Sequence, residues 1–273
     1  MPSASRSRSP RTSPPRTGNR ANSEADRAVG ASAVSARSGQ ALLRLVTPLL
    51  LLVGITIVFR LTPADVVVSR LFYGEGGNGW SYSDPQAYRG VYYLYKFGVV
   101  PGLAMGIGGL IVGLLGSAWL RLRPWRSAGF FLAAMLVVGP GLLINGVAKP
   151  WFQRPRPCHI VDFGGDQTFV PVWGRGPGDA SADVGLSFPS GHAATGFVLM
   201  APAFLLFRQH PKWARAFLLL GLTWGCVMGL GRVAQGDHFV SDVLWAGGLV
   251  YLSGLVLGHL FHLASAVPRG SPA

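Results

Sequence analysis

Charged side chains are scarce in this sequence. Asp, Glu, Lys and Arg make up 13% of its 273 residues, whereas roughly a quarter of the residues in soluble domains are charged. Hydrophobic residues make up 49%, and the mean hydropathy is +0.37. These values exclude an ordinary soluble domain and favour a single all-α domain that crosses a membrane several times.

Cysteine is nearly absent as well. Cys158 lies in a polar stretch and Cys226 in an apolar one, far apart in the chain. This spacing gives no disulfide framework and no metal-binding pattern, so cysteine does not indicate the redox compartment. The sequence also lacks a Gly-x-Gly-x-x-Gly motif after a strand, which excludes a dinucleotide-binding loop.

Acidic residues are few, and the resulting net charge of +13 is unevenly distributed. Residues 1–44 hold eight Arg against Glu24 and Asp26, and are rich in Ser, Pro and Ala. This composition predicts that residues 1–41 form a disordered cytoplasmic tail that contacts anionic lipid. An organelle transit peptide and an RNA-binding tail are the alternatives. For the apolar domain itself we expect no nucleic-acid partner.

Six segments are long and apolar enough to suggest membrane spans, which need about 20 mainly apolar residues. They predict a six-helix bundle over residues 42–262, followed by a short tail at 263–273. The predicted segments are 42–61, 98–120, 128–148, 192–207, 213–231 and 241–262.

Two short basic loops predict the orientation of these spans. Because cytoplasmic loops carry an excess of Lys and Arg, the loops and both termini are expected in the cytoplasm. Segments 62–97, 149–191 and 232–240 then face outward from the inner or plasma membrane. The first of these is rich in Tyr and Trp, which predicts an interfacial aromatic belt and leaves a lipid-headgroup role open. The basic residues are Arg121, Arg123, Arg126, Arg208, Lys212 and Arg215.

On this topology, three polar clusters fall at the outer membrane surface. They read KPWFQRPRP after the third span, LSFPSGHAATG at the start of the fourth, and GRVAQGDHFVSD between the fifth and sixth. Charge at such positions is costly unless it has partners and a function. The residues of interest are Lys149 and Arg156, then Ser190, Gly191 and His192, then Arg232, His238 and Asp242.

The cations of these clusters favour a phosphoryl group as their common ligand. Lys149, Arg156 and Arg232 would repel one another unless a dianion lay between them, and Arg offers paired donors to phosphate oxygens. Ser190 and Gly191 stand where a helix begins, so free backbone N–H groups would point at the same anion. Such an arrangement would stabilise charge that develops during phosphoryl transfer.

The two histidines supply the chemistry. His238 and Asp242 are spaced i, i+4, so the carboxylate is expected to accept the Nδ1 proton and leave Nε2 free to attack phosphorus. His192 would protonate the leaving group and later activate water. The mechanism requires no metal and no cofactor.

Each cluster also has a plain structural interpretation. Lys149 alone resembles a snorkelling residue at a helix end, and Arg154 and Arg156 with their prolines could stiffen a loop. His238 and Asp242 could form a structural polar knot or a transporter's proton relay. All three clusters in order on one predicted face favour a catalytic site instead.

The three clusters together resemble the motifs of the type 2 phosphatidic acid phosphatase family, which includes the vanadium haloperoxidases. The resemblance implies a metal-independent phosphatase with a six-helix fold, phosphate binding by the three cations with Ser190 and Gly191, attack by His238, and His192 as the acid. Asp242 would orient the nucleophile. Gly231 departs from the family pattern, which has Ser before the third-motif Arg. The loop 158–188 and the HFVSDV run are similar to bacterial lipid A phosphatases.

We therefore predict an integral membrane phosphatase that acts on a lipid phosphomonoester or pyrophosphate of the lipid A, undecaprenyl pyrophosphate, phosphatidic acid or phosphatidylglycerophosphate type. The alternatives are a lipid phosphotransferase with a polyprenyl pyrophosphate donor, a vanadate haloperoxidase, and a non-enzymatic lipid-binding or transport protein.

Overall fold

A computed structural model describes residue 43 and residues 45–74, 79–80, 82–84, 86–176 and 186–266, with side chains described as far as residue 261. The predicted tail at 1–41 and most of the predicted tail at 263–273 lie outside these residues. The chain divides into residues 1–47 and a second unit from Pro48 onward, to which the rest of this description refers.

The described residues are mostly helical and contain no strand, in agreement with the predicted all-α class. A first helix at Leu45–Leu61 precedes the others. The α-helices are α2 (Ala64–Arg70), α3 (Arg89–Phe97), α4 (Val100–Ala118), α5 (Arg126–Leu136), α6 (Lys149–Phe152), α7 (Gly191–Phe197), α8 (Ala201–Leu206), α9 (Pro211–Ala234) and α10 (Val240–Ala266), and the short or wide turns are η2 (Arg123–Trp125), η3 (Val137–Ala148), η4 (Pro157–His159), η5 (Val161–Phe163) and η6 (Val198–Met200).

Four of the described helices are long and apolar enough to cross a membrane: Arg89–Ala118, Arg123–His159, Pro211–Ala234 and Val240–Phe261. Helix Leu45–Leu61 bends by 77° into α2, and the pair counts as a fifth span only if it is taken as one. The predicted fourth span corresponds to the shorter apolar helix Gly191–Leu206. The chain is thus an all-α membrane protein with four or five candidate spans, and the predicted number of six is not confirmed.

Close backbone contact joins α4 to α5. Gly109 of α4 faces Gly129 of α5, and a Cβ atom added to Gly129 would lie 2.5 Å from the carbonyl oxygen of Gly109. Small residues let helices approach in this way where no hydrophobic effect drives them together. Beside them, Phe131, Phe197 and Phe204 are buried in a core shared by α5, α7, α8 and α10.

The backbone before α6 forms the wide π-helix η3, which contains Pro140. Proline has no N–H and its ring clashes with the preceding turn of an α-helix, and π-helical turns are frequent at functional sites. The side-chain amide of Asn145 donates to the carbonyl oxygen of Pro140 at 2.7 Å. This bond satisfies a carbonyl inside the wide turn that leads to Lys149.

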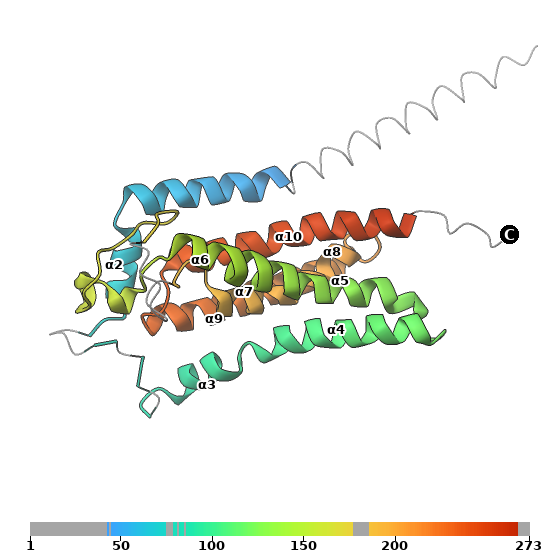
Figure 1. Cartoon of the computed structure of the whole chain (residues 1–273), viewed down its shortest axis with the longest axis horizontal. Coiled ribbons are helices and arrows are strands. Elements are labelled where there is room, and N and C mark those ends of the chain that lie inside the picture. Colours follow the sequence, from blue (N-terminus) through green and yellow to red (C-terminus); the bar gives the residue numbers. More distant parts are fainter. Residues whose placement is uncertain are drawn as a thin grey trace, which may run out of the picture. The chain divides into compact units, whose positions relative to one another are not determined.

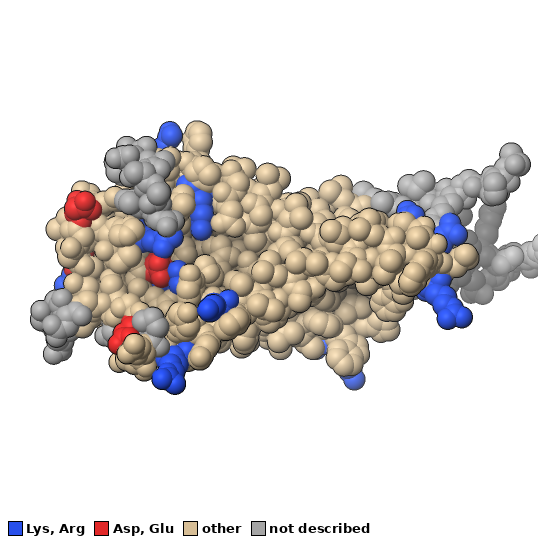
Figure 2. Space-filling view, turned by 60° about the horizontal axis from the view of Figure 1, so that its bottom comes forward, with Lys and Arg blue, Asp and Glu red and all other residues tan. Residues whose placement is uncertain are grey.

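The segments with the polar clusters meet at one end of the helices. Figure 1 shows α2, α6, the start of α7, the end of α9 and the start of α10 at this end, while the turn between α4 and α5 lies at the opposite end. In the face drawn in Figure 2, acidic side chains appear near the first end, basic ones at both ends, and a broad, largely uncharged surface lies between. Such a surface suits contact with hydrocarbon.

Candidate active site

Backbone hydrogen bonds fasten the three polar clusters to one another. The N–H of Ser190, just before α7, donates to the carbonyl oxygen of Asp242 in α10 at 3.1 Å, and Cys158 N–H donates to the carbonyl oxygen of Gly236 at 2.9 Å. These bonds link segments that are far apart in sequence. The structure therefore brings the predicted residues together in one place.

The first two clusters meet beside Gly191. A Cβ atom added to Gly191 would lie 2.9 Å from Oδ1 of Asn145 and 3.4 Å from Nζ of Lys149. A side chain there would crowd both groups, so glycine lets the backbone come close to the lysine. Ser190 caps α7, with its hydroxyl oxygen accepting from the N–H of Ala193 at 3.4 Å.

Arg156 and Arg232 converge on Asp237. Nη1 of Arg156 lies 2.6 Å from one carboxylate oxygen of Asp237, and Nη2 of Arg232 lies 2.8 Å from the other. The Arg232 guanidinium also covers the ring of Tyr95 at 4.3 Å from its centre. Tyr95 in turn packs against the His192 ring, with 5.1 Å between the ring centres. His192 thus lies in the same cluster as the arginines.

His238 is buried, and its Nδ1 atom lies 2.7 Å from the backbone carbonyl oxygen of Ser187. Because a carbonyl oxygen only accepts, Nδ1 carries the proton, and in the neutral ring Nε2 keeps the lone pair. The structure differs here from the expected contact with Asp242, whose Oδ2 is 3.7 Å from Nδ1 and too far for a hydrogen bond. The imidazole therefore has the expected tautomer but a different partner.

Burial lowers the pKa of His238 below its ordinary value of 6.5. The nearby carboxylate of Asp242 acts in the opposite direction, and the charges of Lys149 and Arg232 lower the pKa further. Burial disfavours the charged form of the ring more than the carboxylate favours it. The ring is accordingly neutral at neutral pH and available as a nucleophile.

The carboxylate of Asp242 is held on several sides. Its Oδ2 accepts from the Ser187 hydroxyl and from the backbone N–H of Phe239 at 2.8 Å, while its Oδ1 pairs with Arg154. Ser187 therefore contacts both partners of the predicted pair: its carbonyl oxygen binds His238 and its hydroxyl binds Asp242. Ser187 thus links Asp242 to the histidine.

Arg154 and Asp65 complete this network, although the sequence motifs suggested only a loop-stiffening role for Arg154 and none for Asp65. Arg154 is fully buried, donates to Asp65 at 2.8 Å and to the Ser241 hydroxyl at 2.9 Å, and covers the Phe239 ring at 4.3 Å. Its carbonyl oxygen also accepts from the N–H of Ser187. The Arg154 side chain therefore binds the carboxylates of both Asp65 and Asp242. The Arg154 backbone binds Ser187.

A groove of about 570 Å³ lies between α4, η3 and α7. Its wall is mostly apolar, with Leu103, Leu136 and Leu142 among the lining residues. Its polar end contains Asn145, which adjoins Gly191 and Lys149. The groove therefore lies next to the Gly191 and Lys149 side of the charged cluster.

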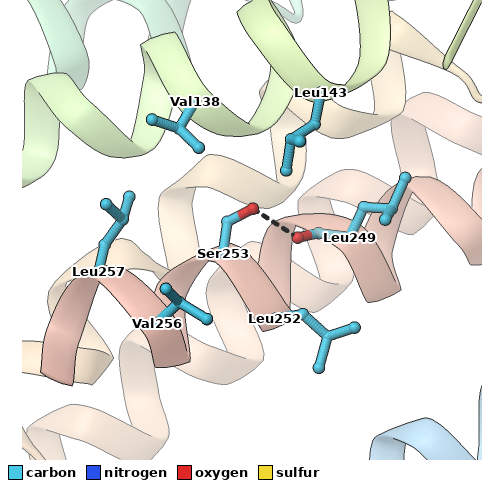
Figure 3. Close-up of a pocket in the computed structure, with 7 residues that line it drawn as sticks. All are labelled: Val138, Leu143, Leu249, Leu252, Ser253, Val256 and Leu257. Carbon is cyan, nitrogen blue, oxygen red and sulfur yellow. Dashed lines mark hydrogen bonds between the residues drawn. The ribbon is translucent and has the colours of Figure 1, made fainter. Parts of the chain in front are cut away.

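A second pocket, of about 200 Å³, lies between η3 and α10 (Figure 3). Val138 and Leu143 of η3 face Leu249 and Ser253 of α10, and the Ser253 hydroxyl donates back to the Leu249 carbonyl oxygen at 2.7 Å. Its lining offers no charged group, so it has no chemistry for phosphate.

Within the described ranges, no three His, Cys, Asp or Glu side chains gather as a metal ion would require. That the reaction needs neither metal nor cofactor stays a prediction.

Curated relatives are phosphatases of bacterial lipids. The chain is 37% identical to "Lipid A 4'-phosphatase" of Francisella tularensis subsp. novicida over 156 residues, 56% of this chain and 68% of the relative. It is 34% identical to "Lipid A 1-phosphatase" of Rhizobium johnstonii over 52% of this chain and 48% of the relative, and 29% identical to "Phosphatidylglycerophosphatase B" of Bacillus subtilis over 44% and 52%. The matches thus span about two thirds of the first relative and about half of the others. No solved structure matches the chain.

The resemblance to lipid A phosphatases that the sequence motifs suggested is confirmed by these relatives. The PAP2 superfamily matches residues 127–266, about half of the chain, and this range contains all three polar clusters. With its site of three cations and two histidines in the matched region, the chain belongs to the PAP2 superfamily.

Proposed function

We propose that the chain is a lipid phosphatase that hydrolyses a phosphomonoester or pyrophosphate at the outer membrane surface through a phosphohistidine. Its family and relatives make it an enzyme that hydrolyses lipid phosphate esters. The proposal adds the roles of single residues, the substrate's headgroup and the side of the membrane. The observation that carries it is the buried His238, whose Nδ1 is bound by the Ser187 carbonyl oxygen beside two convergent arginines.

In the first step, the Nε2 lone pair of His238 attacks phosphorus and the bond to the lipid oxygen breaks. His192 gives its proton to the departing oxygen. Lys149, Arg156 and Arg232 stabilise the charge on the phosphoryl oxygens, helped by the backbone at Ser190 and Gly191. In the second step, His192 takes a proton from water, and the resulting hydroxide attacks the phosphohistidine and releases inorganic phosphate.

The groove between α4 and η3 supports a lipid as the substrate. Its apolar wall suits an acyl or prenyl chain, while its polar end at Asn145 adjoins Lys149 and Gly191. A phosphate bound by the cations would then carry its apolar chain into the groove. For lipid A, undecaprenyl pyrophosphate, phosphatidic acid and phosphatidylglycerophosphate, the shared chemistry is a phosphate next to long chains.

The orientation belongs to the same proposal. Basic residues without acidic ones lie around the turn between α4 and α5 and around the start of α9. The positive-inside rule would put these turns and the chain termini in the cytoplasm and the polar clusters on the periplasmic or extracellular face.

The test is phosphate release by the full chain in detergent from each of these four lipids. We expect release from at least one, and its loss in His238→Ala with the thermal stability of the folded protein retained. Phosphate release by a well-folded His238→Ala protein would remove the assigned nucleophile. Transfer of phosphate to a second lipid, without free phosphate, would instead identify a phosphotransferase.

A further inference from the structure

The mechanism above leaves one carboxylate of the cluster without a role. Asp237, directly before the nucleophile, lies between Arg156 and Arg232 and bonds to both, with 19% of its side chain exposed. Each arginine contributes one terminal nitrogen to one of its two oxygens, at 2.6 and 2.8 Å. Two oxygens of a bound phosphoryl group would seek the same donors.

The other contacts of Arg232 make this competition direct. Its Nη1 donates to Oε1 of Gln235 at 2.7 Å, and its flat face covers Tyr95. The guanidinium is therefore fixed in place, and its Nη2 points at Asp237. The buried Nε atoms of Arg156 and Arg232 have no protein hydrogen-bond partner. An anion that binds the same terminal nitrogens must share them with the carboxylate or displace it.

We infer that Asp237 is a specificity-determining residue that competes with the phosphoryl group for Arg156 and Arg232. This inference rests on the proposed phosphate-binding role of the two arginines. The carboxylate cancels one positive charge of the site and weakens the binding of every phosphate anion. The penalty grows with the charge of the ligand, since like charges repel in proportion to their product.

Two consequences follow for turnover. Inorganic phosphate, the product, would otherwise stay bound to three cations, and Asp237 speeds its departure by pairing again with both arginines. A pyrophosphate group carries more negative charge than a monoester, so Asp237 favours the monoester among otherwise similar lipids.

The experiment measures binding of inorganic phosphate to the full chain in detergent by calorimetry, without a lipid substrate. Asp237→Asn keeps the size of the side chain and removes its charge, and we expect the Kd for phosphate to fall roughly tenfold, the size of one charge-assisted contact. Asp237→Ser should act in the same direction. Asp162→Asn is the matched control, because Asp162 is a carboxylate of the same end of the molecule that pairs with Arg70 at 3.9 Å instead. It should leave the Kd unchanged.

A second measurement compares substrates. In Asp237→Asn, the ratio of kcat/KM for a lipid pyrophosphate to that for the monoester of the same lipid should rise several-fold, and the inhibition constant of phosphate should fall. Arg232→Ala should weaken phosphate binding in both backgrounds.

Equal or weaker phosphate binding in Asp237→Asn would overturn the inference, as would the absence of phosphate binding in every variant. If both Asp237 variants lose their cooperative unfolding transition, Asp237 is a structural residue and the inference is again overturned. If phosphate binds and Asp237→Asn tightens it, but no lipid releases phosphate, the competition stands and the proposed substrate class is wrong.

Discussion

His238 is held by a backbone carbonyl group, and its pKa is set mainly by burial. A carboxylate in direct contact would raise the pKa of the imidazole and favour the cation, which cannot attack phosphorus. With Asp242 at 3.7 Å, the ring keeps the required tautomer while its pKa stays below 6.5. Asp242, which was expected to bind the imidazole, instead accepts a hydrogen bond from the Ser187 hydroxyl.

The first prediction concerns pH. The neutral imidazole is the active form, and a lowered pKa keeps the ring neutral as the pH falls through 6.5. The pH dependence of kcat/KM reports the pKa values of the free enzyme. The midpoint of its acid limb, where activity falls as the pH is lowered, should therefore lie below pH 6.5. Asp242→Asn removes the charge that raises this pKa, so its acid limb should move lower still. An acid limb above pH 6.5 in the wild type would show that another group controls activity.

The second prediction concerns Asp65. Its loss leaves Arg154 buried with half of its counter-charge, and breaking a buried ion pair costs about 3–5 kcal/mol. Asp65→Asn should lower the free energy of unfolding toward this range. It should also reduce kcat at least tenfold with little change in KM, because Asp65 acts through Arg154 on Asp242 and Ser187 and touches no substrate.

The matched control is Ser69→Ala. Ser69 lies in the same helix α2, is equally buried, and has no hydrogen-bond partner for its hydroxyl. Ser69→Ala should therefore have the wild-type free energy of unfolding and the wild-type kcat. A stable Asp65→Asn enzyme with wild-type kcat would show that the network does not position the nucleophile.

These single residues mark the limit of what the sequence could predict. The spacing of His238 and Asp242 suggested one helical turn, although α10 begins only at Val240. The cations were expected together because their repulsion requires an anion. Asp65 and Ser241 form a hydrogen bond although they are 176 residues apart in sequence. No local sequence pattern predicts such a contact. Arg154 was visible in the first cluster, but only its burial distinguishes it from a loop residue.

At the scale of helices, the wide turn η3 gives the site both its lysine and its groove. Pro140 and Asn145 occupy the groove wall, and the helix continues into Lys149. The apolar sequence 128–148 was expected as a regular span. Hydropathy measures composition and cannot show that a proline within the helix has widened its turns.

The third prediction fills this groove. Gly146 lines it, and a Cβ atom added there meets only ordinary contacts at 3.5 and 3.7 Å, so Gly146→Leu should fold. We expect KM for a long-chain lipid phosphate to rise about tenfold, while KM for a short-chain, water-soluble phosphate monoester stays the same. Equal changes for both substrates would show that the chain does not lie in this groove.

Gly108→Leu provides the matched control. Gly108 belongs to α4, lies outside the groove lining, and has nothing within 4 Å of an added Cβ atom. This variant should leave both KM values unchanged.

At the scale of the whole molecule, composition predicted the all-α membrane class correctly, whereas the predicted number of six spans is not confirmed. Helix Gly191–Leu206 begins at the Ser190 cap and is about 24 Å long at 1.5 Å per residue, shorter than the roughly 30 Å of hydrocarbon. The first span is interrupted at Thr62 and Pro63, where the chain bends by 77°. Both features occur next to the polar end, where buried hydrogen bonds join these segments to α10.

The fourth prediction concerns orientation. The background protein carries Cys158→Ser and Cys226→Ser, so that it has no native cysteine. In this background, Asp162→Cys should react with a membrane-impermeant maleimide in cells whose outer membrane alone has been made permeable. Arg123→Cys, between α4 and α5, should react only after the membrane is opened. The reverse pattern would place the active site in the cytoplasm.

The central claim is that phosphate is carried by His238, and rapid quenching with a ³²P-labelled lipid phosphate tests it most directly. In the wild-type protein, the account predicts that label appears on the protein during turnover in an acid-labile, alkali-stable form that maps to His238, and that His238→Ala takes up none. Label on another residue, or turnover without any labelled protein, would contradict it.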